Sequence, residues 1–219
     1  MWVLFRFAGL VCVAALANAC VSFPEVSEAV APPVIAGNVV QSTDGALLGV
    51  KHWPAEQPRA VILALHGMND YSNAFAGPAL WWAENANIET YALDQRGFGR
   101  SPSFGTWVGS ATLKEDLRAT IAAIRADHGD VPLYVLGHSM GAAVVMAAEA
   151  ETTLGADGLI LAAPGVWGGK ALPVSHRLAV NMAATFAPSK TLTGERTARQ
   201  ATDNIDILRA MSRDPLVIK

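Results

Sequence analysis

The sequence predicts an α/β protein, with a mostly parallel sheet and helices on both faces. Short apolar runs alternate along the chain with longer segments whose apolar residues recur at helical spacing. One run, residues 60–65, is apolar throughout, as expected of a strand buried on both faces. A lone serine between two glycines stands where another run passes into an alanine-rich segment. At 219 residues, the chain is long enough for one domain with a sizeable core.

The first twenty residues predict an export signal. Arg6 precedes an apolar run that ends at Ala17-Asn18-Ala19, which is the layout of a secretory signal peptide with a small-residue cleavage site. Cleavage there would leave Cys20 as the first residue. This resembles a bacterial lipoprotein signal, in which the cysteine is acylated and anchors an exported protein at a membrane. Periplasmic or secreted export without a lipid and an uncleaved N-terminal anchor are the alternatives. We expect a signal peptide over 1–19 and a proline-bearing tether over 20–37.

The core pattern begins at residue 38. Two runs flank Thr43-Asp44-Gly45 and predict a β-hairpin. A buried strand follows over 60–65. Aromatic and aliphatic residues on one side of 75–86 predict a helix, and 88–94 predict a second strand that leads into a glycine-bearing turn.

The alternation of helix and strand continues to residue 164. Four apolar residues recur at helical spacing over 110–129, which closes with a glycine. The patterns that follow predict a strand, a helix and a strand over 132–137, 139–151 and 157–164. Such alternation is typical of right-handed βαβ units, so we place the core at 38–163. Residues 164–219 contain helical pieces without a convincing buried strand, which predicts a cap.

The lone serine lies in the stretch Gly137-His138-Ser139-Met140-Gly141, between a predicted strand and a predicted helix. This G-x-S-x-G pattern in that context is typical of a nucleophile elbow, where a strained turn exposes the serine hydroxyl. Side chains at positions 137 and 141 would collide with neighbouring backbone. The N–H groups at the start of the following helix would then face the hydroxyl.

A second motif, "LHGMNDYS", ends the first buried strand. The backbone N–H groups of Met68 and Met140 could together form an oxyanion hole. We expect His66 to be a structural histidine that hydrogen bonds to backbone. In the third motif, "DQRGFGRS", we expect Asp94 and Arg96 to fix loops near the site.

These three motifs, in this order and spacing, resemble the α/β-hydrolase superfamily, and more narrowly its monoacylglycerol lipase and lysophospholipase branch. The resemblance is strong over about residues 38–165 and loose in the cap. It implies an α/β-hydrolase fold with Ser139 as the nucleophile of an ester hydrolase that forms an acyl-enzyme. It also implies a lipid ester substrate, namely monoacylglycerols or lysophospholipids. Apolar cap residues could line the passage for an acyl chain, foremost Trp167, Leu178 and Met182, and otherwise pack against the core.

The partners that would activate Ser139 are not evident. In the superfamily the order is Ser, then Asp or Glu, then His. Downstream of Ser139, the only histidine is His176. Asp157 opens a strand, so it should lie at the wrong end of the sheet, and Glu149 and Glu151 lie turns away along the helix. We therefore expect a chain that lacks the last strands of the fold and is catalytically incomplete by itself.

Two other functions stay open, and several kinds of partner are disfavoured. A serine peptidase or another serine hydrolase of the same fold, and a non-catalytic binding protein, are the competing functions. A net charge of −3 and scattered basic residues argue against nucleic-acid binding. No cluster of histidine, cysteine and carboxylate has metal-ligand spacing, so we expect no metal and no organic cofactor. The sequence does not indicate an oligomeric state.

Overall fold

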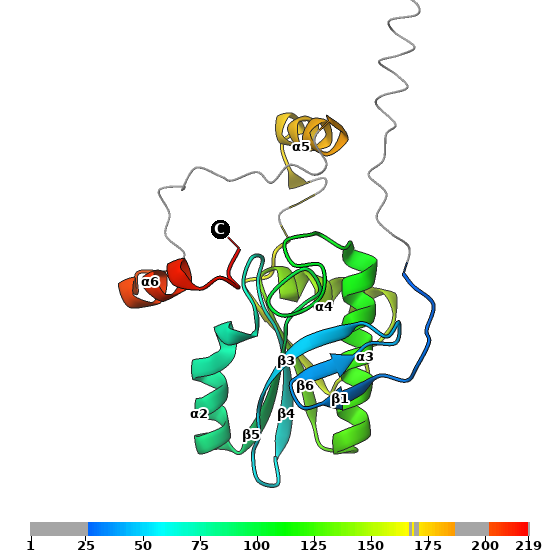
Figure 1. Cartoon of the computed structure of the whole chain (residues 1–219), viewed down its shortest axis with the longest axis vertical. Helices are drawn as coiled ribbons and strands as arrows, with labels where there is room; N and C mark the ends of the chain where they lie inside the picture. Colours follow the sequence, from blue (N-terminus) through cyan, green and yellow to red (C-terminus); the bar gives the residue numbers. More distant parts are fainter. Residues whose placement is uncertain (1–25, 167, 169–170, 187–201, 219) are drawn as a thin grey trace, which may run out of the picture. The chain divides into compact units, whose positions relative to one another are not determined.

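The computed structural model of the chain describes residues 26–166, 168, 171–186 and 202–218 (Figure 1). These form two compact units. One comprises the described residues of 26–166 and 202–218, and the other comprises the described residues from 168 to 186. The first unit contains the whole sheet and all three sequence motifs.

The sheet of the first unit has seven strands in the order β1-β2-β3-β5-β4-β6-β7. The last four strands of this order run parallel to one another, and β1, β2 and β3 extend them in antiparallel pairs. The predicted α/β class is therefore confirmed. The strands are β1 (Val34–Ala36), β2 (Val39–Gln41), β3 (Leu47–Trp53), β4 (Ala60–Leu65), β5 (Ile88–Leu93), β6 (Leu133–His138) and β7 (Gly158–Ala162).

Strand β4 lies in the middle of the parallel part and is buried along its whole length. Its residues alternate between two apolar clusters, because successive strand side chains point to opposite faces. Val61, Leu63 and Leu65 belong to the larger cluster. Ile62 and Ala64 belong to the smaller one. The uninterrupted run "AVILAL" is thus explained by helices covering both faces.

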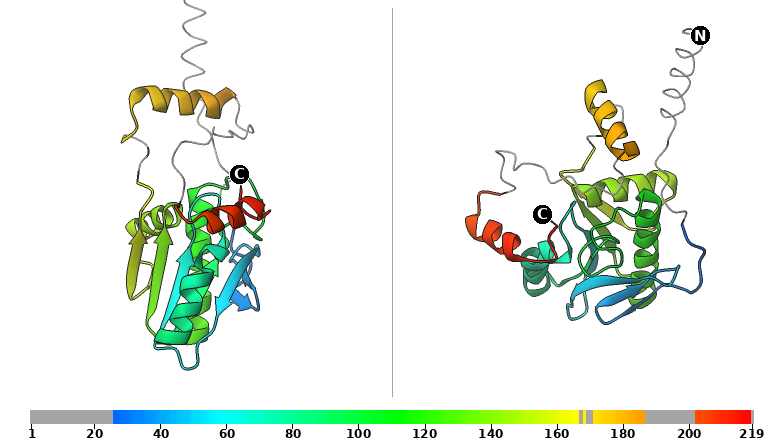
Figure 2. Two further views of the ribbon diagram at one scale, coloured as in Figure 1. Left: turned by 90° about the vertical axis from the view of Figure 1, so that its left-hand side faces the viewer. Right: turned by 45° about the horizontal axis from the view of Figure 1, so that its top comes forward.

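The helices divide between these faces, as Figures 1 and 2 show. Helices α3 (Ser110–His128) and α4 (Met140–Glu151) contribute Leu117 and Val145, among others, to the larger cluster. Helix α2 (Ala76–Ala86), preceded by the 3-10 turn η1 (Ser72–Phe75), packs Trp82 against the smaller one.

Two parts of the sheet differ from a plain reading of the sequence. Val34–Ala36, inside the segment expected to be a tether, pair with β2 through a tight turn in which Gly37 has φ +59°. At the opposite edge, β7 pairs only with β6 among the described strands. Leu159, Ile160 and Leu161 of β7 are between 37% and 42% exposed, so this edge presents unusually apolar surface.

Two helices follow the sheet in sequence. Helix α5 (Val174–Phe186) belongs to the second compact unit, and α6 (Ile205–Arg213) belongs to the first. The described part of the region from 164 to 218 contains no strand, as the sequence predicted. Among the helices described, none combines the length and the apolar character that crossing a membrane requires. The division into signal peptide, tether, core and cap stays a prediction.

Candidate active site

The three motifs meet at the carboxyl ends of the parallel strands. Strands β4, β5 and β6 are parallel neighbours, so their carboxyl ends lie together. The loop after β4 carries His66 and Met68, the loop after β5 carries Asp94, and Ser139 follows β6 directly. Parallel pairing alone therefore brings together residues that are some seventy positions apart in sequence.

Ser139 occupies a strained turn between β6 and α4. Its backbone has φ +52° and ψ −110°, in the left-handed range of φ that non-glycine residues rarely adopt. Its N–H group donates to the carbonyl of Ala162 at 3.0 Å. Its carbonyl accepts the N–H groups of Ala143 and Gly165 at 3.1 and 2.9 Å. The backbone of the turn is thus held from β7 and from α4, which offsets the cost of its conformation.

Glycines flank the serine because the surrounding backbone leaves no space for a side chain. A Cβ atom at position 137 would lie 2.6 Å from the backbone nitrogen of Ala142. One at position 141 would lie 2.8 Å from the carbonyl oxygen of His66, and closer still to that of Leu65. The collisions predicted from the sequence are confirmed. They show that α4 begins in direct contact with the loop after β4.

That loop also lies against Ser139. A Cβ atom at Gly67 would stand 3.3 Å from the Cβ atom of Ser139 and 3.2 Å from Nδ1 of His138. In addition, the N–H group of Gly141 donates to the carbonyl of His66 at 3.1 Å. The first residues of the loop therefore run alongside the serine.

His66 is fully buried and fixed by backbone contacts. The N–H group of Gln95 donates to its Nε2 atom at 3.0 Å. Because Nε2 accepts, the proton is assigned to Nδ1, which donates to the carbonyl of Gly67 at 2.8 Å. Burial lowers the pKa of His66, so the neutral ring is favoured. The structural role expected for His66 is confirmed.

This contact has a consequence for Met68. The carbonyl of Gly67 and the N–H group of Met68 belong to one planar peptide and point in opposite directions. By holding that carbonyl, which also accepts the N–H group of Asp70 at 3.3 Å, His66 sets the orientation of the Met68 N–H group. The N–H group of Met140 stands in the first turn of α4, where backbone donors have no intrahelical acceptor. The Met68 side chain is 54% exposed, and that of Met140 is buried.

Asp94 fixes the two neighbouring loops. It is 1% exposed, and its carboxylate accepts the N–H group of Ser72 at 2.7 Å and that of Arg100 at 2.8 Å. Gly99, with φ +57°, permits this close approach, because a Cβ atom there would overlap the Asp94 carboxylate. The loop-fixing role expected for Asp94 is confirmed.

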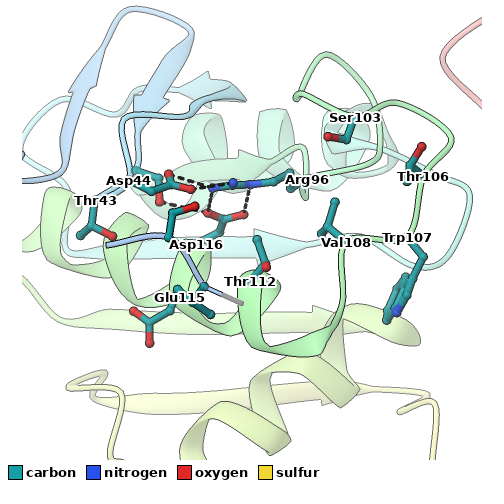
Figure 3. A pocket seen from close by; sticks show the side chains of 13 residues that line it. Thr43, Asp44, Arg96, Ser103, Thr106, Trp107, Val108, Thr112, Glu115 and Asp116 are labelled. Carbon is teal, nitrogen blue, oxygen red and sulfur yellow. Dashed lines mark hydrogen bonds and ion pairs between the residues drawn. The ribbon is translucent and has the colours of Figure 1, made fainter. Parts of the chain in front are cut away.

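Arg96 joins the turn between β2 and β3 to helix α3, beside a cavity of about 260 Å³ (Figure 3). Its guanidinium group binds the carboxylate of Asp44 at 2.7 and 3.0 Å and that of Asp116 at 2.6 and 3.0 Å. The hydrogen bond from Arg96 lowers the pKa of Asp44. Burial raises the pKa of Asp116, and Arg96 opposes that rise. Ser139 does not line this cavity, and the charges of Arg96, Asp44 and Asp116 are paired with one another. We therefore assign the cavity no chemistry.

Three carboxylates downstream of Ser139 are engaged elsewhere. Asp157 accepts the N–H group of Leu133 at the amino end of β6, the end opposite to Ser139. Glu149 accepts the N–H group of Leu154 beyond the end of α4, and Glu151 pairs with Lys114. The exclusion of all three as partners of Ser139 agrees with these positions.

The remaining predicted site residues lie outside the elbow or outside the described chain. Leu178 and Met182 stand four residues apart on α5, on one face of the helix, and are 60% and 53% exposed. His176 is on the same helix in the second compact unit. Trp167 and Cys20 are outside the described residues. Within the described ranges, no group of three or more His, Cys, Asp or Glu side chains could hold a metal ion.

Sequence reasoning missed two contacts of the loop after β4. Tyr71 of the "LHGMNDYS" motif hydrogen bonds to Asp214, and Asn69 to Ile218. Both partners come from the segment that was expected to be cap. No local pattern links positions so far apart, so only the folded chain reveals the pairing.

Comparison with known proteins adds a family. A family model described as "Serine aminopeptidase, S33" matches residues 56–219. Monoglyceride lipase of Rattus norvegicus is 29% identical over 125 residues, which are 56% of this chain and 41% of the lipase. Monoacylglycerol lipase of Mycolicibacterium smegmatis is 32% identical over 114 residues, or 52% and 40% of the two chains. The chain thus spans about two fifths of the length of these relatives.

Solved structures support the fold. A thermostable carboxyl esterase from Bacillus coagulans, in complex with glycerol, superposes with a TM-score of 0.63 at 21% identity, covering 82% of this chain and 65% of the esterase. Monoacylglycerol lipase of Paleococcus ferrophilus gives a TM-score of 0.59 at 20% identity, with coverages of 78% and 64%. At these identities the likeness establishes the architecture of the α/β hydrolases.

Proposed function

This chain belongs to the α/β-hydrolase family described as "Serine aminopeptidase, S33", and we propose that it acts as a serine ester hydrolase on monoacylglycerols or lysophospholipids. One observation carries the proposal: Ser139 has φ +52° at the start of α4, with the Gly67 backbone against its Cβ atom. The similarity to monoglyceride lipases supports the lipid ester as substrate.

In the proposed reaction, the Ser139 hydroxyl attacks the ester carbonyl carbon. The new bond joins Oγ to that carbon while a base takes the hydroxyl proton. The ester C–O bond then breaks, and the departing alcohol takes the proton. Water hydrolyses the acyl-enzyme and releases the fatty acid. The Met68 and Met140 N–H groups stabilise the oxyanion in both steps, each contributing about 3 kcal/mol as in comparable sites.

A histidine must take the Ser139 proton and an acid must orient that histidine. We propose that both act from outside the residues gathered at the elbow, because Asp157, Glu149 and Glu151 are engaged elsewhere. For the same reason we propose that the 219-residue chain alone has little hydrolase activity. On α5, Leu178 and Met182 would contact the acyl chain, together with Trp167.

The test uses the protein encoded by the complete reading frame. A fluorophosphonate probe should label it, and Ser139→Ala should abolish labelling. Ser175→Ala, which removes an exposed serine on α5, is the matched control and should leave labelling unchanged. Equal labelling of the wild type and Ser139→Ala would remove Ser139 from the mechanism.

The family description favours a second candidate, a serine aminopeptidase. Monoacylglycerols, lysophospholipids and aminoacyl p-nitroanilides assayed side by side separate the two functions. Faster turnover of the anilides would replace the lipase proposal with the peptidase. Absence of turnover on every substrate, together with absence of labelling, would favour the non-catalytic binding protein.

For location, we propose that the protein is exported and anchored by acylation of Cys20. The support is the arrangement of Arg6, the apolar run and Ala17-Asn18-Ala19 before this cysteine. Mass spectrometry of the mature N-terminal peptide should show a lipid-modified Cys20, and Cys20→Ser should move the protein out of the membrane fraction. An unmodified N-terminus, with the protein still at the membrane, would instead favour the uncleaved anchor.

A further inference from the structure

A segment near residue 214 contacts the loop that carries Met68. The hydroxyl of Tyr71 donates to Oδ2 of Asp214 at 2.6 Å. Nearby, the N–H group of Ile218 donates to the carbonyl of Asn69 at 2.9 Å. Two separate hydrogen bonds therefore join the loop after β4 to residues 214–218, which lie about 140 positions later in sequence.

Tyr71 and Asp214 each make further contacts besides their mutual hydrogen bond. Tyr71 is 6% exposed, and the Arg100 guanidinium lies 5.8 Å from the centre of its ring. Burial, the larger cause, and the hydrogen bond to Asp214, the second, raise the pKa of Tyr71 to about 12. The hydroxyl therefore remains a donor at neutral pH. Asp214 is the C-cap of α6, and its Oδ1 atom accepts the N–H group of Leu216 at 2.9 Å. Its two carboxylate oxygens thus bind its own segment and the loop.

These bonds act on the part of the loop that lies between two anchors. His66 holds the peptide between Gly67 and Met68, and Asp94 holds the N–H group of Ser72. Between these anchors, Asn69 has φ +66°, a left-handed conformation that asparagine adopts more readily than most non-glycine residues. The Ile218 bond fixes the peptide that follows Asn69, and the Asp214 bond fixes the side chain of Tyr71.

We propose that residues 214–218 are a brace for the oxyanion hole, in which Asp214, through Tyr71, is a positioning residue for the Met68 N–H group. The inference rests on the proposed function, because it assigns to Met68 a donor role in ester hydrolysis. Loss of the brace lets the loop between His66 and Ser72 sample other conformations. The Met68 donor is then misplaced, and transition-state stabilisation falls while substrate affinity is retained.

The experiment compares Tyr71→Phe, Asp214→Ala and the double variant in the protein from the complete reading frame. Asp206→Ala is the matched control, since it removes an exposed carboxylate on α6 that pairs with Arg209. Two quantities are measured: kcat and KM on a short-chain p-nitrophenyl ester, and amide hydrogen exchange of residues 67–71.

We expect kcat to fall about tenfold in Tyr71→Phe and up to about a hundredfold in Asp214→Ala, with KM within about twofold of wild type. Complete loss of one oxyanion donor, which sets the upper bound, lowers kcat about 10²–10³-fold. The double variant should be no slower than Asp214→Ala, because both changes remove one interaction. Exchange of residues 67–71 should accelerate in all three, while Asp206→Ala matches wild type.

Unchanged kcat and unchanged exchange in Tyr71→Phe would overturn the brace, as would additive losses in the double variant. An increase in KM with kcat retained would show that the contact serves substrate binding instead. If Asp214→Ala does not fold, Tyr71→Phe decides, since it removes a single hydroxyl. If the wild type does not turn over esters, the proposed function fails, and hydrogen exchange alone decides whether the brace exists.

Discussion

Gly141→Ala is the sharpest test of how the elbow is built. Position 141 lies in the first turn of α4, where alanine is ordinarily the better helix former by up to about 1 kcal/mol. A Cβ atom there would nevertheless stand 2.8 Å from the carbonyl oxygen of His66. Ordinary contact begins at 3.4 Å, and the carbonyl oxygen of Leu65 would lie closer than that of His66, so the helix or the strand end must move by more than about 0.6 Å.

The expected cost follows from these contacts. Overpacking of this kind destabilises by about 1–3 kcal/mol, and displacing the Gly141 N–H group from the His66 carbonyl at 3.1 Å costs about 1 kcal/mol more. After the helix-propensity gain is deducted, we expect a net loss of about 2 kcal/mol. For a chain of this size, that lowers Tm by about 4–8 °C. Fluorophosphonate labelling of Ser139 should fall as well, because the loop with Met68 is displaced.

Gly77→Ala is the matched control, because Gly77 is also helical and a Cβ atom there would meet no atom within 4 Å. It should leave stability unchanged or raise it by up to about 1 kcal/mol. Urea denaturation followed by tryptophan fluorescence measures both variants, with equal m-values required for comparison. If Gly141→Ala proved as stable as Gly77→Ala and was labelled like wild type, the steric account of the elbow would be refuted.

Three further predictions concern the polar contacts. Arg96→Met should destabilise the fold by about 3–5 kcal/mol in urea denaturation, because it leaves the carboxylates of Asp44 and Asp116 unpaired; a loss below about 1 kcal/mol would contradict this. Tyr91→Phe removes a hydroxyl that donates to the buried Glu89 carboxylate at 2.9 Å. It should lower the free energy of unfolding by about 1.5–3 kcal/mol in the same assay, and an unchanged urea midpoint would contradict this. The pKa of Asp44 is lowered in the folded state, so its ionised carboxylate stabilises the fold at pH values above its unfolded pKa of about 3.9. This contribution is lost as pH falls through the folded pKa, so the difference in stability between wild type and Asp44→Asn should shrink below about pH 4. A difference that stayed constant with pH would show that the pKa of Asp44 does not change on folding.

The elbow could be predicted from sequence because its causes are local. A strand that turns into a helix within a few residues forces Ser139 to positive φ, and the same geometry excludes side chains at Gly137 and Gly141. Buried strands such as β4 were equally accessible, since burial on both faces requires an uninterrupted apolar run. Short strands were harder: Val34–Ala36 carry no period, and only pairing with β2 makes them a strand.

The contacts that orient the site could not be predicted in the same way. Asp116 stands in the middle of α3, where a carboxylate ordinarily faces solvent, yet it is 1% exposed against Arg96. The partner of Tyr71 is 143 residues away. Such pairings depend on which distant segments the fold brings together, and neither periodicity nor motif spacing predicts those long-range contacts.

The two kinds of interaction have separable consequences at the site. The positions of the donors depend on the parallel order of β4 and β6, so changes there, as at Gly141, should affect stability and reactivity together. The orientation of one donor also depends on a contact made from outside the sheet, namely that of Asp214 with Tyr71. Changes there should therefore lower turnover more than they lower stability. Gly141→Ala and Tyr71→Phe therefore form a pair. If the ratio of lost activity to lost stability were the same in both variants, the loop would move with the sheet as one body. Residues 214–218 would then have no separate effect on the orientation of the Met68 N–H group.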